Sequence, residues 1–320
     1  MGRIEPGPQD AITDVPGVRV GHAQAASGQR TGVTVVAPPS LPLPAGVATV
    51  NGVGELTGKL WIEERGAIRT PVYLCGTHAV GTVLQAAVLA SGRGPEDVAV
   101  PAVAECDDGE MADSRTVSGD DVQRALDDLG AEVREGTVGA GTGMSCFDFP
   151  GGIGTASRLV GEHHLGVLLL CNFGYGDREY LDVLGHRLDS SPTKAGSRGS
   201  CIAVCATDAP LSAQQLRRLA LRPLLGLARV GSYAAEGSGE IGLAFATSTA
   251  QDFATGKLDP YFAAAYEAAH EAVYNCLVAA RPAERLDGSM QDEFPTEAVR
   301  RLARSREGSA IASNPSTAPG

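Results

Sequence analysis

A polar, glycine-containing segment runs directly into an apolar strand at the dipeptide Gly199–Ser200. Residues 194–199 include a lysine, an arginine, a serine and two glycines, whereas residues 201–206 are apolar throughout. Taken alone, the dipeptide favours a simple loop end, because serine hydroxyls often satisfy backbone groups in turns. The alternative is a self-cleaving peptide bond, which would turn Ser200 into a new N-terminus.

Self-cleavage needs a backbone that tolerates strain and a hydroxyl that reaches the preceding carbonyl. Gly199 meets the first need, since glycine adopts conformations that other residues avoid. Attack by the Ser200 hydroxyl on the Gly199 carbonyl would form an ester, whose hydrolysis would leave an α piece (1–199) and a β piece (200–320). The freed α-amine of Ser200, with a reference pKa of about 7.7–8.0, would act as general base for its own hydroxyl.

Other polar positions fit amide hydrolysis, which also needs a proton shuttle and donors for the oxyanion. Ser238 and Glu240 lie two residues apart, so on an extended segment their side chains share a face and would orient the Ser200 amine. Asn172 follows the apolar run 165–170, and its amide N–H would donate to an oxyanion. The alternatives are a glycine-rich turn with a solvated carboxylate, and an asparagine in a turn.

Several motifs, spread over most of the chain, carry a resemblance to a known family. They lie at 12–22, 51–58, 151–158, 168–174, 199–211, 226–231 and 237–247. In this order they resemble the DmpA-like family of self-processing aminopeptidases, the L-aminopeptidase/D-esterase and β-peptidyl aminopeptidase group. The resemblance extends to about residue 280. It implies a four-layer αββα sandwich of the N-terminal-nucleophile-hydrolase type, formed by one domain over residues 1–303.

The resemblance also assigns roles to the candidate residues. It makes Ser200 the nucleophile, Ser238 and Glu240 the pair that serves its amine, and Asn172 an oxyanion donor. It implies a substrate that is a small peptide or an amino-acid amide or ester, with L, D or β stereochemistry varying among members. It further implies a homo-oligomer of αβ units.

One segment departs from the family pattern. The family has a segment resembling Glu-Thr-Tyr-Asp-Gly-x-Leu-Asn-Asp, and residues 105–113 are its counterpart here. Asp107 then stands where the family has an oxyanion tyrosine, and Ala112 stands where it has an asparagine. An ionised carboxylate cannot donate a hydrogen bond to an oxyanion. By charge complementarity, Asp107, Asp108 and Glu240 are candidates to bind the substrate's ammonium group.

Two other functions stay open at this point. One is acyl transfer on a similar fold, as in the self-cleaving ornithine acetyltransferases, which have a threonine nucleophile. The other is a non-catalytic binding protein that never cleaves, an alternative that the departures at Asp107 and Ala112 keep open.

Composition excludes other classes. A net charge of −12 argues against a nucleic-acid-binding surface, and no apolar run approaches the roughly 18 residues of a membrane span. Seven cysteines without framework spacing fit reduced thiols in a cytoplasm. We expect no metal and no cofactor, since residues 270–274 lack the second histidine of a zinc motif and the glycine-rich stretch 139–155 lacks the lysine of a phosphate loop.

Periodicity and capping signals predict the main elements. Strands are expected at 12–20, 32–36, 47–50, 98–103, 165–170, 201–206 and 241–247. Helices are expected at 78–90 capped by Thr77, at 119–129 capped by Ser118, from Ser212 through 225 with Pro223 kinking or ending it, and at 261–280. Residues 304–320 are polar and rich in Ser, Ala and Pro, and are expected to form a disordered tail.

Overall fold

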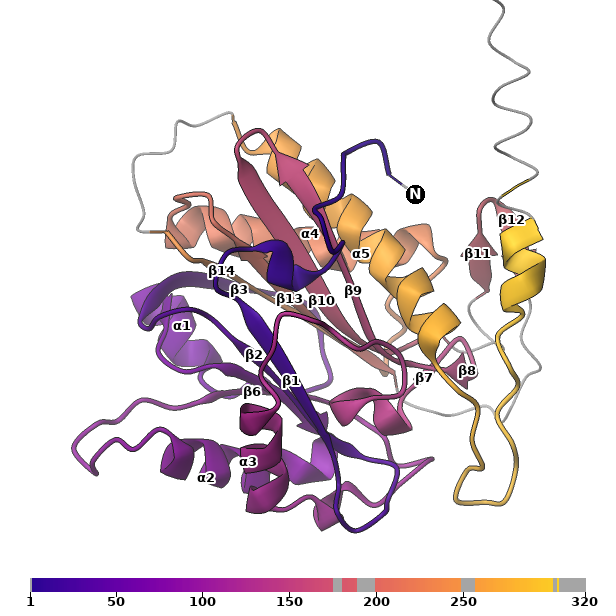
Figure 1. The fold of residues 1–320 in the computed structure, drawn as a ribbon, viewed down its shortest axis with the longest axis horizontal. Helices are drawn as coiled ribbons and strands as arrows, with labels where there is room; N and C mark the ends of the chain where they lie inside the picture. The colour runs from indigo at the N-terminus through magenta and orange to yellow at the C-terminus, as the bar shows by residue number, and fades with distance from the viewer. Residues whose placement is uncertain (1, 175–179, 189–198, 249–256, 302–303, 305–320) are drawn as a thin grey trace, which may run out of the picture.

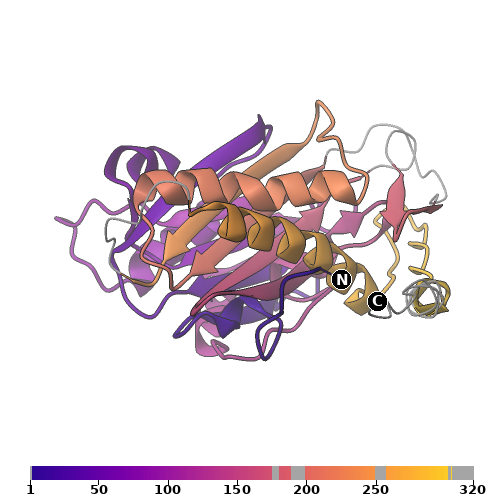
Figure 2. The same ribbon diagram turned by 90° about the horizontal axis from the view of Figure 1, so that it is seen from above.

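Two β-sheets lie face to face, and helices cover the outer face of each sheet (Figure 1 and Figure 2). The computed structural model describes residues 2–174, 180–188, 199–248, 257–301 and 304. The four layers are the αββα sandwich expected from the resemblance, and that prediction is confirmed. The tail expected from residue 304 lies outside the described residues, apart from residue 304 itself.

The larger sheet has six strands in the order β4-β3-β14-β13-β10-β9. They are β3 (Leu43–Gly52), β4 (Ala67–Ile68), β9 (Gly152–Val160), β10 (His163–Asn172), β13 (Ser200–Thr207) and β14 (Gly239–Ala246). β13 and β14 run parallel, and the other neighbours run antiparallel. The strand that begins at Ser200 is therefore an inner strand, paired on both sides.

The smaller sheet has four strands in the order β1-β2-β5-β6. They are β1 (Arg19–Gln24), β2 (Gly32–Ala37), β5 (Val72–Gly76) and β6 (Ala102–Cys106). β5 and β6 are parallel, whereas the other pairs are antiparallel. β6 is an edge strand, and it packs against β13 of the larger sheet.

Each sheet has its own pair of helices. α4 (Ala213–Arg229) and α5 (Asp259–Ala279) cover the larger sheet, whereas α2 (Val80–Ala90) and α3 (Gly119–Asp127) cover the smaller one. α1 (Lys59–Arg65) contacts β3 and β4. None of the helices in the described part of the chain is long and apolar enough to cross a bilayer.

Shorter elements connect these layers. Four are 3-10 helices, η1 (Ile12–Asp14), η2 (Thr77–Ala79), η3 (Ser114–Thr116) and η4 (Gly139–Gly143). Two are small hairpins, formed by β7 (Ser145–Cys146) with β8 (Phe149–Pro150) and by β11 (Leu181–Val183) with β12 (His186–Leu188).

The apolar character of β13 follows from its place between two packed layers. Ile202 and Val204 point into the core between the sheets. Ala203 and Cys205, on the opposite face of the strand, point into the core under α4 and α5. Successive side chains of a strand face opposite sides, so a strand buried on both faces reads as a continuous apolar run. A third core lies between the smaller sheet and its helices.

Four of the expected elements differ from the structure, each for a local reason. Residues 12–14 form a 3-10 helix and the strand begins only at Arg19, because a turn at Gly17 with φ +80° separates them. The strand expected at 98–103 is β6, which begins after Pro101, a residue with no amide donor. Thr77 does not cap α2, because its hydroxyl donates to the carboxylate of Glu105.

The fourth difference concerns α4. Pro223 lies inside this helix, which continues to Arg229 and so does not end at the proline. The side chain of Pro223 is buried in the packed face of the helix, where tertiary contacts offset the lost backbone hydrogen bond.

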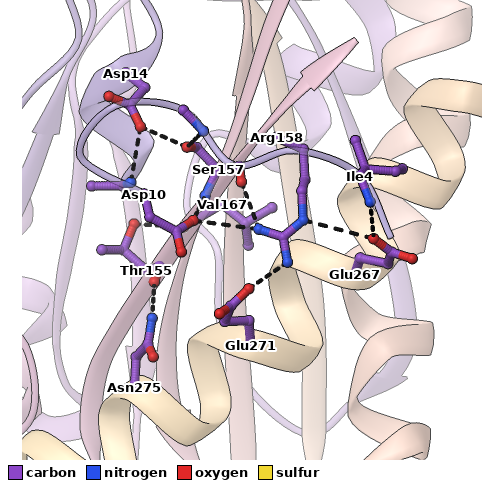
Figure 3. Close-up of polar contacts among 12 residues, drawn as sticks. Ile4, Asp10, Asp14, Thr155, Ser157, Arg158, Val167, Glu267, Glu271 and Asn275 are labelled. Carbon is purple, nitrogen blue, oxygen red and sulfur yellow. Dashed lines mark hydrogen bonds and ion pairs between the residues drawn. The ribbon is translucent and has the colours of Figure 1, made fainter. Parts of the chain in front are cut away.

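The N-terminal segment is fastened to β9 and α5 by polar contacts around one buried arginine (Figure 3). Arg158 is 1% exposed and forms ion pairs with Asp10 at 3.3 Å, with Glu267 at 3.8 Å and with Glu271. Glu267 also accepts from the backbone N–H of Ile4 at 3.1 Å. A buried cation is stable only when it is paired, and this cluster pairs it with carboxylates from two elements.

Candidate active site

Ser200 sits at the first position of β13, with a polar residue on each neighbouring strand. It is 3% exposed, and it lies directly opposite Asn172, the last residue of β10. On its other side it pairs with Gly239 of β14, which stands between Ser238 and Glu240 in the sequence. The structure therefore brings together the four residues that the sequence selected for catalysis and oxyanion binding.

The carbonyl group of the proposed scissile bond is held by a hydrogen bond. The backbone N–H of Gly239 donates to the Gly199 carbonyl oxygen at 3.0 Å. A donor in this position polarises the carbonyl and would stabilise negative charge that develops on its oxygen. Residues 189–198, which precede this bond, lie outside the described residues.

Ser238 and Glu240 share one face of the chain, as their spacing predicts. The Ser238 hydroxyl donates to the Glu240 carboxylate, and the two residues are 4% and 2% exposed. Glu240 is the cross-strand neighbour of Cys201, the residue that follows Ser200. A buried carboxylate so close to the start of β13 provides negative charge for a cation that forms there.

The side-chain amide of Asn172 is held at both ends. Its Oδ1 accepts from the backbone N–H of Ser145 at 2.9 Å, and its Nδ2 donates to the backbone carbonyl of Asp107 at 2.8 Å. An amide nitrogen carries two N–H groups, so one remains for a substrate oxygen. Asn172 is 3% exposed, which keeps its geometry fixed.

Close backbone packing places Ser145 beside this amide. A Cβ added at Gly151 would lie 2.5 Å from the carbonyl oxygen of Cys171 and 2.8 Å from the backbone carbon of Ser145. Only glycine allows such an approach. Gly151, in the glycine-rich stretch, thus lets the backbone of Ser145 lie close enough to β10 to hydrogen-bond Asn172.

Asp107 and Asp108 take different positions from each other. Asp107 is exposed, its carboxylate accepts from the Gly109 N–H at 2.9 Å, and its backbone carbonyl contacts Asn172. Asp108 is 2% exposed and lies against Gly76 and Ser114. Burial raises the pKa of Asp108 to about 6, although side-chain hydrogen bonds act in the opposite direction. Among the described residues, the hydrogen-bond partners of these two carboxylates do not include Ser200.

Glu105 is a site residue that sequence reasoning missed. Its carboxylate accepts from the backbone N–H of Glu55 at 2.9 Å and from the Thr77 hydroxyl, and burial raises its pKa. A Cβ added at Gly54 would lie 3.3 Å from Glu105 Oε1 and 3.8 Å from the Cα of Gly239, so only Gly54 separates this carboxylate from the site. The strand expected in this region ended at residue 103, so the sequence pattern did not place Glu105 on a buried strand, whereas β6 extends to Cys106.

The thiols form no disulfide. All seven cysteines are free and buried. Among the residues that the structure describes, no group of three or more His, Cys, Asp or Glu side chains is arranged to hold a metal ion.

The fold and the place of the serine define a class before any particular relative is considered. A serine that begins an inner strand of a sheet in an αββα sandwich, with a glycine before it, is the arrangement of an N-terminal-nucleophile hydrolase. Comparison with known proteins gives the family. The model of peptidase family S58 matches residues 10–291.

Individual relatives agree with this match. The chain is 37% identical to the beta-peptidyl aminopeptidase BapA of Sphingosinicella microcystinivorans, over 93% of this chain and 88% of that protein. A β-aminopeptidase of Burkholderia sp. has a TM-score of 0.85 at 38% identity, covering 95% of this chain and 96% of that one.

A second solved structure describes the fold. The L-aminopeptidase D-Ala-esterase/amidase of Ochrobactrum anthropi, a prototype for the serine aminopeptidases and a new variant of the Ntn hydrolase fold, has a TM-score of 0.83 at 34% identity. It matches 96% of this chain and 96% of its own. The chain belongs to peptidase family S58.

Proposed function

We propose that this chain is a self-processing serine aminopeptidase whose nucleophile is the Ser200 hydroxyl. Membership of a peptidase family makes the chain a hydrolase, and the similar proteins are named aminopeptidases. These findings do not favour the acyltransferase alternative. The observation that supports the assignment to Ser200 is its place at the start of β13, opposite Asn172 on one side and opposite Gly239, between Ser238 and Glu240, on the other. The Gly239 N–H also donates to the Gly199 carbonyl oxygen.

Self-processing would proceed in two balanced steps. The Ser200 hydroxyl attacks the Gly199 carbonyl carbon, and collapse of the intermediate breaks the C–N bond and transfers the hydroxyl proton to the departing amine. The resulting ester is then hydrolysed by water. This frees the carboxylate of Gly199 and restores the Ser200 hydroxyl, now beside a free α-amine. The Gly239 N–H would hold the oxyanion in the first step.

Substrate hydrolysis would use the same residues in new roles. The α-amine of Ser200 takes the proton of its own hydroxyl, and Glu240 with Ser238 orients that amine and stabilises its charged form. Asn172 donates to the oxyanion of the substrate. The Ser200 oxygen attacks the substrate's carbonyl carbon, and the scissile bond breaks as the protonated α-amine returns its proton to the departing amine or alcohol. Water then hydrolyses the acyl-enzyme ester, which releases the N-terminal residue of the substrate as its carboxylate and restores the Ser200 hydroxyl.

The substrate is proposed to be a short peptide, amide or ester with a free amino group. Glu105 is the candidate that best fits recognition of this ammonium, because it is buried beside Gly54 and Gly239, whereas Asp108 faces Ser114 and Gly76. The similar proteins from Sphingosinicella microcystinivorans and Burkholderia sp. are named a beta-peptidyl aminopeptidase and a β-aminopeptidase, so we propose that β-aminoacyl substrates are accepted.

The test combines an intact mass under denaturing conditions with activity on alanine and β-alanine p-nitroanilides, for the wild type and Ser200→Ala. We expect two wild-type fragments that separate between Gly199 and Ser200, and one full-length mass with no activity for Ser200→Ala. A wild-type chain that stays in one piece on long incubation and hydrolyses neither anilide would overturn the proposal and favour a non-catalytic binding protein. Hydrolysis by Ser200→Ala would show that another group is the nucleophile.

Two finer expectations complete the proposal. We propose a homo-oligomer of αβ units, as the resemblance implies, and light scattering on the purified protein would measure its mass. We propose a cytoplasmic location, which the seven free thiols support because reducing compartments preserve them. Fractionation of cells that produce the chain would test the location.

A further inference from the structure

A loop that follows α5 lies against the hairpin of β7 and β8 (Figure 1). This loop, residues 283–291, is here called the C-terminal loop. It turns back on itself, since the Gln291 N–H donates to the Ala283 carbonyl at 3.0 Å and Glu284 forms a β-bridge with Met290. Gln291 is 4% exposed, although two acidic residues follow it in the sequence. The mechanism described so far gives this buried amide no role.

The amide of Gln291 contacts the residue that orients Asn172. Gln291 Nε2 donates to Ser145 Oγ at 3.0 Å, and the backbone N–H of Ser145 donates to Asn172 Oδ1 at 2.9 Å. Two hydrogen bonds therefore connect the C-terminal loop to the proposed oxyanion amide. Because a buried hydrogen-bond network restricts the motion of its members, the held Ser145 keeps its N–H directed at Asn172.

The same loop contacts the segment that carries the other partner of Asn172. The Leu286 N–H donates to the Glu110 carbonyl at 3.0 Å. Glu110 follows closely after Asp107, whose backbone carbonyl accepts from Asn172 Nδ2. The C-terminal loop thus forms hydrogen bonds with both of the chain segments that hold this amide.

The turn of the β7–β8 hairpin is also held by this loop. Phe147 and Asp148, the two residues between the strands, have φ of 51° and 64°, a left-handed conformation that residues other than glycine rarely adopt. Such a backbone persists where its surroundings hold it. The guanidinium of Arg285, which is 8% exposed, donates to the Asp148 carbonyl at 3.4 Å and to the Met290 carbonyl at 3.0 Å. The loop therefore contacts both the turn and Ser145 at the start of the hairpin.

We propose that Gln291 is a positioning residue for the oxyanion amide: it fixes Ser145, which sets the direction of the Asn172 N–H that meets the substrate oxygen. This inference rests on the proposed function, since it takes Asn172 as an oxyanion donor. A donor that is held in place before the reaction stabilises the oxyanion without a further cost of orientation. Loss of the Gln291 amide should therefore lower kcat and leave substrate binding almost unchanged.

Gln291→Met tests this role, because methionine has nearly the same length and shape but no amide donor. Loss of one neutral hydrogen bond should lower kcat on β-alanine p-nitroanilide about fivefold, with KM changed less than about twofold. Ser145→Ala removes the same hydrogen bond from its other end and should lower kcat to a similar extent. In the double variant the two effects should not add.

A second cycle places Gln291→Met in the Asn172→Asp background, where the amide donor to be positioned is gone. There kcat should change less than about twofold. Gln123→Met is the matched control, because the Gln123 amide also donates to a side chain, Asp127 Oδ1 at 2.9 Å, but lies on α3. It should leave kcat unchanged, and thermal midpoints of all variants show whether each is folded.

A Gln291→Met enzyme with wild-type kcat would overturn the inference, and so would an equal decrease of kcat in the wild-type and Asn172→Asp backgrounds. Effects of Gln291→Met and Ser145→Ala that add in the double variant would also overturn it, because they would show that the two side chains act separately. Activity that survives in Ser200→Ala would instead overturn the proposed function, so the two failures are distinguishable.

Discussion

At the scale of single residues, the amide of Asn172 has one usable orientation because its two ends meet different partners. The Ser145 N–H can only donate, so it faces Oδ1, and the Asp107 carbonyl can only accept, so it faces Nδ2. Both partners are backbone groups, so the main chain fixes the direction of the remaining N–H. The second anchor is the backbone of Asp107, so this hydrogen bond does not depend on which side chain stands at position 107.

Substituting Asn172 by aspartate tests the donor role. The carboxylate keeps the bond from Ser145 but faces the Asp107 carbonyl without a proton and cannot donate to an oxyanion. Loss of an oxyanion donor lowers kcat by roughly 10² to 10³-fold, and we expect a decrease of this size in steady-state hydrolysis of β-alanine p-nitroanilide.

The control for this change is Asn275→Asp. Asn275 lies on α5 and donates to the Thr155 carbonyl at 2.9 Å, so its substitution alters a partly buried amide that hydrogen-bonds a different strand from that of Ser200. We expect a lower thermal midpoint with little change in kcat. A similar kcat for Asn172→Asp and Asn275→Asp would contradict the oxyanion assignment.

The spacing of residues in the sequence predicted that Ser238 and Glu240 lie together, whereas contacts between distant segments determine where Glu105 and Asp108 lie. Ser238 and Glu240 share a face because alternation along an extended segment requires it. Glu105 could not be found in this way, since the expected strand ended at residue 103, and its place near Gly239 depends on the backbone at Gly54, which lies against both residues. The direction of Asp108 likewise depends on its contact with Gly76, far away in the sequence.

At the scale of elements, close approach of α5 to the larger sheet depends on glycine. A Cβ added at Gly154 of β9 would lie 1.9 Å from the carbonyl oxygen of Ala272 on α5. Backbone cannot move aside as a flexible side chain can, so the helix would have to shift away from the sheet.

We therefore expect Gly154→Ala to lower the free energy of unfolding by roughly 1–3 kcal/mol. Gly81→Ala is the matched control, because Gly81 lies in α2 and its added Cβ would meet nothing within 4 Å. An alanine there should raise helix stability by about 0.5–1 kcal/mol. Urea unfolding of both variants in the uncleaved Ser200→Ala background measures the difference, and effects of the same sign would contradict the packing argument.

The first residues of helices were predictable because a capping box depends only on residues three positions apart in the sequence. Ser118 and Ser212 each accept from a backbone N–H three residues on, as their sequences predict. Thr77 offers the same local chemistry but donates to Glu105, a partner on another strand. A cap is therefore predictable only where no tertiary partner competes for the hydroxyl.

At the scale of the whole molecule, the N-terminal contacts make stability depend on pH. Glu135 accepts from the Thr155 N–H at 2.8 Å, and burial raises its pKa to about 7, with smaller contributions from the charges of Asp10 and Glu271. Asp10 and Glu271 themselves form ion pairs with Arg158 (Figure 3). The stability due to protonation of Glu135 is fully present below about pH 4.5 and is lost as pH rises through about 7.

Glu135→Gln keeps the acceptor oxygen and mimics the protonated form. We expect it to raise the free energy of unfolding by about 1–3 kcal/mol at pH 8 and to have little effect at pH 4.5. Denaturation at several pH values measures this, with the exposed Glu64→Gln as control. A gain that is equal at both pH values would show that the Glu135 charge is not responsible.

The order of strands in the larger sheet has a consequence for a chain that has cut itself. β13 and β14 come from the β piece, and they lie between β3 and β10, which come from the α piece. Before cleavage, folding is a reaction within one molecule, with a rate that does not depend on concentration. After cleavage, a fully denatured enzyme can rebuild this sheet only when two separate chains meet, so recovery becomes second order and slows on dilution. The proposed cut would thus make the first folding independent of protein concentration, and every later refolding dependent on it.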